Sequence, residues 1–419
     1  MKLHSNLYYR NFFIASSLLA ISFFFFFIRN FEYIIFLFLV TLYYFFKKDI
    51  KIDNFIYLYI FIYGLVQIAQ YIKFDFLPIT VYLGLHLRIF TAYFCVKIID
   101  DDFVNINIKV IYFFGCISLF FYSICVLFPQ FTIFMINNIT PHFTSFFEIN
   151  NNVFNIEHSN KNIIIFNFHG LTELLTPRNS GPYWEPGVNA GICTIALIFN
   201  YLSKGIIRSK ENVVFLLNII TSFSTTGYFL LVLFFIFFTK QSLFTRSIYF
   251  SFILLVSVLS FNTFDFLGDK INKQLQGVEI SESGYSLVKV NRFGSALVDL
   301  YDFKEHPFFG RGRSIETRIK NFSNRFDYAD THRNNGITHY LVSYGIFIFI
   351  FFIYLLKKSF NSLCIYYNRS SFYSSVLLFM ILIMSFSELY FRRPFFIALT
   401  LLFLVYSGKK NDINESFKK

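Results

Sequence analysis

The chain has 419 residues, of which 55% are hydrophobic and 15% are charged, and its formal net charge is +12. Average soluble domains carry roughly 25% charged residues, so this composition excludes a soluble globular protein. Repeated apolar runs of membrane length favour one polytopic membrane domain over two or three soluble domains. The positive charge must then be interpreted loop by loop, and it does not indicate nucleic-acid binding.

Twelve apolar segments are predicted to cross the membrane as helices. Along the chain, the predicted division is five helices in 1–128, a first external loop in 129–186, four helices in 187–261, a large external loop in 262–335, three helices in 336–408 and a tail in 409–419. The predicted fold class is therefore an all-α integral membrane protein with about 12 transmembrane helices and two larger loops on one side.

Basic residues in the short connections set the predicted orientation. Lys47, Lys48 and Lys51 follow the second apolar segment, and such connections face the cytoplasm by the positive-inside rule. The apolar stretch 212–239 is long for one helix and is interrupted by a polar Ser/Thr-rich break at 221–227. Counting it as two helices keeps the later lysine-rich connections on the cytoplasmic side, with both termini.

One charged pair lies within the predicted fourth helix. Arg88 is placed near the middle of the membrane, and His86 is two residues earlier and so on a different helical face. Ionisable residues at this depth are kept where they are paired or functional. Arg88 is either part of a structural pair inside the bundle or a contact for an anion or a lipid headgroup.

The segment before the sixth helix is rich in Pro and Gly and carries Arg178, Trp184 and Glu185. Trp184 is the only tryptophan of the chain. An interfacial Trp often anchors a helix, and Glu185 could simply complement the helix dipole. A rigid loop that fixes an arginine and a glutamate beside a helix N-terminus also forms an anion site, and we favour this functional interpretation.

The large external loop contains a predicted amphipathic helix, 285–300, with Arg292, followed by Arg311 and Arg313. Guanidinium groups bind phosphates in a bidentate manner, so several in one loop suit a diphosphate. Arg318 and Arg325 are assigned to a solvated helical face. His332 precedes the tenth helix, and either a structural or a catalytic role is open to it.

Arg392 and Arg393 follow Glu388 in the predicted outer turn between the last two helices. Two arginines on the external side oppose the positive-inside trend. An anionic partner on that side explains them best, and pairing with Glu388 is the alternative.

The order of these features resembles that of bacterial O-antigen polymerases, the Wzy-type members of the O-antigen polymerase and ligase superfamily. The motifs, over residues 175–400, are Arg178-x-x-Gly181-x-x-x-Glu185-Pro186, Ser224-Thr225-Thr226-Gly227, Arg292 followed by Pro307-Phe308-Phe309-Gly310-x-Gly312, and His332-x-Asn334-Asn335 ahead of Gly345. Thr225 stands where ligase-like members tend to have Arg, which favours the polymerase.

The resemblance implies a GT-C-like glycosyltransferase of lipopolysaccharide or related polysaccharide biosynthesis in the bacterial inner membrane, with its site facing the periplasm. It would transfer a growing glycan from undecaprenyl diphosphate to a new undecaprenyl-diphosphate-linked repeat unit, with a chain-length regulator as a further partner. Glu185 or His332 would be the catalytic base, and the diphosphate or glycan would be bound by Arg88, Arg178, Trp184, Arg292, Arg311, Arg313, Arg392 and Arg393. An O-antigen ligase and a flippase of lipid-linked oligosaccharides are the alternatives.

No metal or other cofactor is expected. The run Asp100-Asp101-Asp102 is the obvious acidic cluster, but it is predicted on the cytoplasmic side, away from the site. The five cysteines show no Cys-x-x-Cys or Cys/His spacing typical of zinc sites or disulfide frameworks. The expected partners are lipid-linked sugars and membrane lipid, with no nucleic acid.

Overall fold

A computed structural model describes residues 2–28, 31–76, 78–143, 161–168, 177–238, 251, 279–281, 284–286, 292–318, 335–407 and 409. These residues are mostly helical. The α-helices are α1 (Lys2–Phe23), α2 (Phe25–Ile28), α3 (Glu32–Lys47), α4 (Asn54–Phe74), α5 (Ile79–Ile99), α6 (Phe103–Leu127), α7 (Pro129–Phe134), α11 (Pro186–Lys204), α12 (Lys210–Thr221), α13 (Thr225–Phe238), α16 (Arg292–Glu305), α17 (Ile315–Arg318), α18 (Gly336–Tyr366), α19 (Phe372–Ser387), α20 (Pro394–Thr400) and α21 (Phe403–Tyr406).

Smaller elements lie in the connections. A 3₁₀ turn, Asp100–Asp102, joins α5 to α6, and α7 continues into a π-helical turn, Met135–Ile139, and a second 3₁₀ turn, Thr140–Phe143. Two short antiparallel ladders pair β1 (Asn162–Ile163) with β2 (Phe166–Asn167), and β3 (Glu279–Ser281) with β4 (Gly284–Ser286). Both ladders belong to the segments that were expected to be external loops.

Four apolar helical stretches in the described part of the chain are long enough to cross a membrane. They are Asn54–Phe74, Ile79–Leu127, Pro186–Lys204 and Gly336–Tyr366. The structure is thus that of a helical membrane protein, as the composition indicated. The count of twelve spans stays a prediction, because 247–261, expected to hold the ninth, lies outside the described residues apart from position 251.

The polar break at 221–227 separates two helices, as predicted. α12 ends at Thr221, Phe223 adopts a positive φ of 46°, and α13 begins at Thr225. α13 then runs alongside α11. The rings of Tyr201 and Phe238, near the last turns of the two helices, lie 5.4 Å apart. Gly227 allows this close approach, since a Cβ there would lie 2.6 Å from the Cβ of Ala190.

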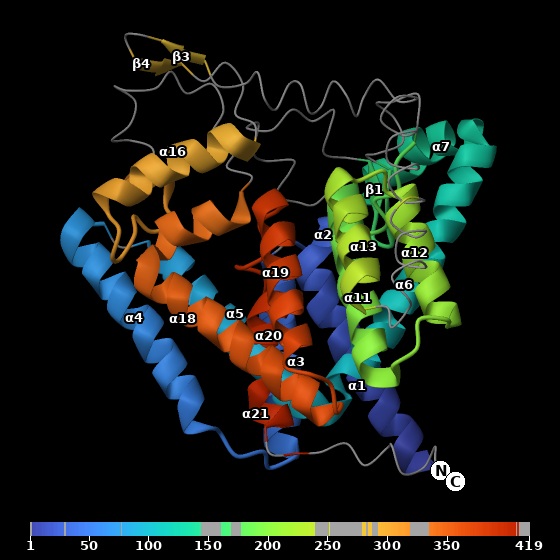
Figure 1. Cartoon of the computed structure of the whole chain (residues 1–419), viewed down its shortest axis with the longest axis horizontal. Helices are drawn as coiled ribbons and strands as arrows, with labels where there is room; N and C mark the ends of the chain where they lie inside the picture. The colour runs from blue at the N-terminus through green and yellow to red at the C-terminus, as the bar shows by residue number, and fades with distance from the viewer. Residues whose placement is uncertain are drawn as a thin grey trace.

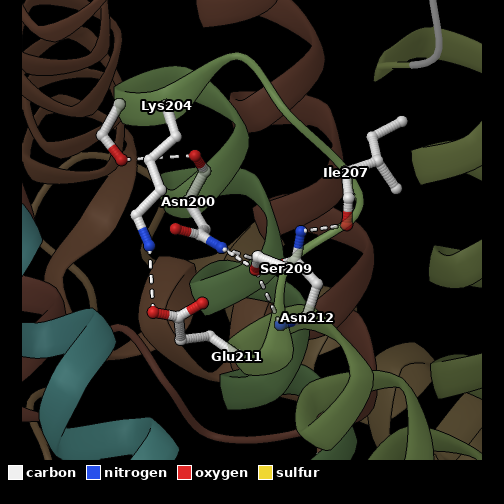
Figure 2. A network of polar contacts seen from close by, with 7 residues as sticks. Asn200, Lys204, Ile207, Ser209, Glu211 and Asn212 are labelled. Carbon is white, nitrogen blue, oxygen red and sulfur yellow. Dashed lines mark hydrogen bonds and ion pairs between the residues drawn. The ribbon is translucent and has the colours of Figure 1, made fainter.

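The turn between α11 and α12 is held by side chains rather than by the backbone alone (Figure 2). Asn200 donates from Nδ2 to the Ser209 hydroxyl at 2.9 Å and to Oδ1 of Asn212 at 2.8 Å. The Ser209 hydroxyl in turn accepts the backbone N–H of Asn212, which makes it the N-cap of α12. Lys204 and Glu211 form an ion pair across the same turn at 3.0 Å.

Basic connections gather at one end of the bundle. Lys97 pairs with Asp53 at 3.1 Å, Lys409 pairs with Asp100 at 3.1 Å, and the guanidinium of Arg369 donates to the carbonyl of Leu202. These contacts lie at the connections α3–α4, α5–α6, α11–α12 and α18–α19. The orientation of this end toward the cytoplasm stays a prediction.

The opposite end carries α16, which lies across the bundle above α18 and α19 (Figure 1). Residues 292–305 form this helix, so the predicted helix over 285–300 is wrong at its start. Gly284–Ser286 instead pairs with Glu279–Ser281 as an antiparallel strand. The helix ends shortly before Pro307, as expected for a residue that cannot continue it.

α18 is broken at Gly345, where φ is 78° and ψ is 175°. The segment 307–312 packs against this break with its backbone. The N–H groups of Arg311 and Gly312 donate to the carbonyls of Val342 and Ser343 at 2.8 and 3.1 Å, and Ile346 donates to the Pro307 carbonyl at 2.8 Å. The loop thus replaces the hydrogen bonds that the helix loses at the break.

Candidate functional site

The loop before α11 is fixed by buried asparagines. The Asn179 side chain accepts hydrogen bonds from the Ser118 hydroxyl and the Gly181 N–H, at 2.7 and 3.0 Å, and donates to Asn218 and Thr221. Gly181 has a φ of 56°, which favours glycine. Because these partners come from α6 and α12, the loop holds Arg178, the residue directly before Asn179, in one place beside α11.

Arg292, at the start of α16, lies between two carboxyl groups. Its Nη2 is 2.8 Å from Oε1 of Glu388 and 3.7 Å from Oε2 of Glu185. Trp184 donates from Nε1 to Oε2 of Glu388 at 3.2 Å. The Glu388 side chain is 8% exposed and that of Glu185 is 47% exposed. Glu388 therefore holds the cluster together, while Glu185 is accessible to a substrate.

The electrostatics distinguish the two glutamates further. Burial, with the nearby charge of Glu185, raises the pKa of Glu388 well above its ordinary value, although Arg292 opposes this shift. Burial also lowers the pKa of Arg178, whose neighbours include Glu185 and Arg292. Arg178 donates from Nε to the carbonyl of Ser222 at 3.1 Å. The sequence-predicted residues Arg178, Trp184, Glu185 and Arg292 thus come together, with Glu388 as an added member.

Four further arginines, Arg88, Arg313, Arg392 and Arg393, form what we call the arginine group. Burial and the charges of Arg313, Arg393 and Arg88 lower the pKa of Arg392 well below its ordinary value. Burial and the charges of Arg88 and Arg313 lower the pKa of Arg393 to about 9. The group therefore combines a residue of α5 with residues of the 307–314 loop and of the turn between α19 and α20.

In the described part of the chain no Asp or Glu lies within ion-pair distance of any of the four, although the charge of Glu388 partly opposes the lowering of the Arg393 pKa. The buried Nε atoms of Arg313 and Arg393 find no hydrogen-bond acceptor there either. Buried donors without acceptors are uncommon and unfavourable. An anion with several oxygen atoms would satisfy them.

A small pocket opens at this group. It is lined by Arg313, Gly336, His339, Tyr340, Tyr344, Leu389, Phe391 and Arg392. Its volume is about 10 Å³, which is room for roughly one water molecule. A diphosphate is larger, so its binding would require these long, flexible side chains to move apart.

We call Arg178, Glu185, Arg292 and Glu388 the acidic cluster. Trp184 connects this cluster to the arginine group. Its indole N–H binds Glu388, and the guanidinium of Arg393 lies 4.6 Å from the centre of its ring. Phe23 and Tyr390 pack near the same ring. The two clusters consequently form one continuous site at the end of the bundle that carries α16.

Two of the other arginines in the predicted external loop have carboxylate partners in the structure. Arg311 is buried and paired with Glu305, while its backbone is bound to α18. The assignment of Arg318 to a solvated face is wrong, because it is buried and paired with Asp299 at 2.6 Å. Asp299 also accepts from the Thr338 hydroxyl, so this pair joins α16 to α18. His332 and Arg325 lie outside the described residues.

His86 faces away from the arginine group and is bound to Gln67 of α4 at 2.8 Å. His339, which was not predicted, lines the pocket and lies 3.3 Å from the Ser343 hydroxyl. The only sequence signal for His339 was its place one turn after the start of a helix on the external side. Among the described residues, His, Cys, Asp and Glu side chains form no group of three that could hold a metal ion.

Comparisons with known proteins do not assign this site: no family model, no curated protein and no solved structure matches the chain. Its chemistry is therefore argued from the residues that surround it.

Proposed function

We propose that the protein is a glycosyltransferase of the O-antigen polymerase type, which uses lipid-diphosphate-linked glycans as donor and acceptor. The observation that carries this proposal is the arginine group, four arginines with no carboxylate within ion-pair distance among the described residues, placed next to an accessible glutamate. In this proposal the site faces the periplasm from the bacterial inner membrane, since the basic connections lie at the other end of the bundle.

The arginine group is suited to the diphosphate of the donor. Guanidinium groups remain charged near neutral pH and bind phosphate oxygens through paired hydrogen bonds. Arg88 is the tenth residue of α5. A phosphate held by all four arginines would therefore lie at the border of the apolar region. The lipid chain of the donor then stays in the membrane while its sugar reaches the acidic cluster.

The transfer would form one bond and break another. A hydroxyl oxygen of the acceptor sugar bonds to the anomeric carbon of the donor glycan, and the bond from that carbon to the phosphate oxygen breaks. Undecaprenyl diphosphate leaves with the electron pair, and the arginine group stabilises the charge that develops on it. The proton of the acceptor hydroxyl passes to the carboxylate of Glu185, the more accessible glutamate of the cluster.

Arg292 and Glu388 would act through Glu185. Glu388 fixes the Arg292 guanidinium at 2.8 Å, which leaves Arg292 close to Glu185 at 3.7 Å. The positive charge favours the ionised form of Glu185 that a base requires. Glu388 is thus a positioning residue, and its buried side chain is not in reach of a sugar in solution.

The direct test uses purified full-length protein in lipid nanodiscs with a synthetic undecaprenyl-diphosphate-linked repeat unit. A polymerase yields a ladder of longer lipid-linked glycans and releases undecaprenyl diphosphate. Recovery of unchanged substrate in a competent preparation would contradict the proposal. In cells, deletion should leave a single capped repeat unit in place of a ladder, whereas complete loss of O-antigen from lipid A would favour a ligase.

A flippase is separated by the same assay, because transport makes no new glycosidic bond. Neutralising Arg88 would not separate the two functions, since Arg88 belongs to the arginine group and its loss should impair both. A flippase would instead tolerate Glu185→Gln, because a group that accepts a proton from a sugar hydroxyl has no part in transport.

A further inference from the structure

A second charged pocket lies at the other end of α18 from the proposed active site. It has a volume of about 650 Å³ and is open to the outside of the bundle. Its lining residues are Tyr354, Lys357, Lys358 and Asn361 of α18, with Ser370, Ser371, Phe372 and Ser375 around the start of α19. The nearby guanidinium of Arg369 donates to Leu202, which places the pocket at the basic end of the bundle.

The polar groups of this pocket favour an anion. The Lys357 ammonium donates to the hydroxyls of Ser374 and Ser375, at 2.7 and 2.6 Å, and is half-buried. Lys358 is exposed, with its ammonium 4.1 Å from the centre of the Phe403 ring. In the described part of the chain neither lysine has a carboxylate within ion-pair distance. Two positive charges thus face one pocket without balancing negative charges.

The start of α19 adds serine hydroxyls to the same pocket, from Ser370, Ser371 and Ser375. The first backbone N–H groups of this helix are already bonded within the chain. That of Phe372 donates to the Ser370 hydroxyl, and those of Tyr373 and Ser374 donate to the carbonyls of Ser370 and Ser371. The two lysines therefore supply the positive charge of the pocket, and the serines supply neutral polar groups beside it.

An apolar strip leads away from the pocket along both helices. On α18, Phe347, Ile350 and Tyr354 are exposed at a spacing of three and four residues, so they share one face. On α19, Phe372 and Phe379 are exposed as well. A free phosphate would use only the charged pocket, whereas a phospholipid would use both the pocket and the strip.

We propose that this pocket is a binding site for an anionic phospholipid, with the headgroup phosphate on Lys357 and Lys358 beside the serine hydroxyls of the pocket, and the acyl chains along the exposed faces of α18 and α19. A zwitterionic lipid also brings a positive charge close to the two lysines, so its electrostatic attraction to the pocket is weaker. The site is separate from the proposed active site and does not depend on the proposed function.

The test measures lipid bound to the purified full-length protein by native mass spectrometry. Detergent-solubilised protein is titrated with phosphatidylglycerol and, separately, with phosphatidylcholine. We expect phosphatidylglycerol to bind more tightly than phosphatidylcholine. In K357Q/K358Q the affinity for phosphatidylglycerol should fall about fivefold for each lysine removed, which is the usual effect of one basic residue near an anionic lipid. The charge-preserving variant K357R/K358R should retain the preference.

The matched control is K47Q/K51Q, which removes two exposed lysines from the same end of the bundle but outside the pocket. It should bind phosphatidylglycerol as the unaltered protein does. Equal binding of both lipids, a preference that survives K357Q/K358Q, or an equal loss in the control would overturn the proposal. Displacement of the lipid by millimolar inorganic phosphate would also overturn it, because the site would then belong to a soluble anion.

Discussion

Arg392→Gln should make the protein more stable without ligand and weaker in diphosphate binding. Arg392 has no carboxylate within ion-pair distance among the described residues, and the charges of Arg313, Arg393 and Arg88 act against its own. Two like charges 4 Å apart repel by about 4 kcal/mol at an effective dielectric of 20, and less at longer range. Removing one charge should therefore stabilise the free protein by about 1 kcal/mol.

The same substitution removes hydrogen bonds to the diphosphate. A hydrogen bond to a charged group contributes about 1.5–3 kcal/mol, so affinity should fall roughly 10- to 150-fold. At a ligand concentration 100 times the original dissociation constant, binding stabilises the folded protein by about 2.7 kcal/mol, and a 100-fold loss of affinity reduces this to about 0.4 kcal/mol. Thermal unfolding in nanodiscs, with and without undecaprenyl diphosphate, measures both effects.

Arg318→Gln is the matched control, because Arg318 has the carboxylate partner that Arg392 lacks. The substitution removes the guanidinium group that faces the buried carboxylate of Asp299, which should destabilise the protein by about 3–5 kcal/mol. The two Arg-to-Gln changes are thus expected to shift the unfolding temperature in opposite directions. If Arg392→Gln destabilises the free protein and leaves the ligand-induced shift unchanged, the interpretation of the arginine group as an anion site is refuted.

Four other predictions follow from the site and the fold. Glu185→Gln should lower polymerisation by roughly 10²–10⁴-fold while the thermal shift with undecaprenyl diphosphate is retained. Because folding raises the pKa of Glu388, the folded chain keeps a proton that the unfolded chain loses, so the stability of the protein should fall as pH rises above 4.5. Unfolding temperatures measured against pH should show this slope, and Glu388→Gln should flatten it. Gly345→Ala should destabilise the protein by about 2–4 kcal/mol in thermal unfolding, since φ is positive and the added Cβ would meet the Phe308 carbonyl. Gly64→Ala in α4 should instead stabilise the protein by about 0.5–1 kcal/mol, because the added Cβ would have no other atom within 4 Å. Polymerisation should persist in excess EDTA.

Each of these expectations has an outcome that contradicts it. Full activity of Glu185→Gln would exclude this residue as the base. An unchanged pH slope in Glu388→Gln would mean that the carboxyl group is not the source of the slope. Equal stability effects of Gly345→Ala and Gly64→Ala would argue against a strained break in α18. Loss of activity in EDTA, restored by a divalent ion, would introduce a metal requirement.

The sequence predicted the helical membrane character and several members of the site because these depend on local properties. Apolar runs indicate membrane helices, and polar breaks such as 221–227 end them. Charges on the unexpected side of the membrane indicate partners, which is how Arg178, Glu185 and Arg393 were identified. Residues 178, 185 and 292 then lie together with Glu388 in the structure.

The remaining features depend on contacts that spacing along the chain does not contain. Arg318 was expected on a solvated surface because nothing nearby in sequence indicates Asp299, 19 residues earlier and on another helix. The convergence of Arg88 with the loop arginines links α5 to segments more than 200 residues away. The start of α16 was misplaced because an amphipathic pattern over 285–300 does not exclude a hairpin in its first residues.

The break in α18 has a consequence for how the site can change in evolution. Backbone groups of residues 307–312 hold the loop to the helix, and Arg313 follows immediately after the two residues that donate to Val342 and Ser343. The position of this arginine therefore depends on the length of the loop and its glycines more than on neighbouring side chains. A lineage could vary the surrounding loop residues while this arginine keeps its place. Under the proposed function, such changes would alter the sugar that is recognised without moving the arginine that binds the phosphate.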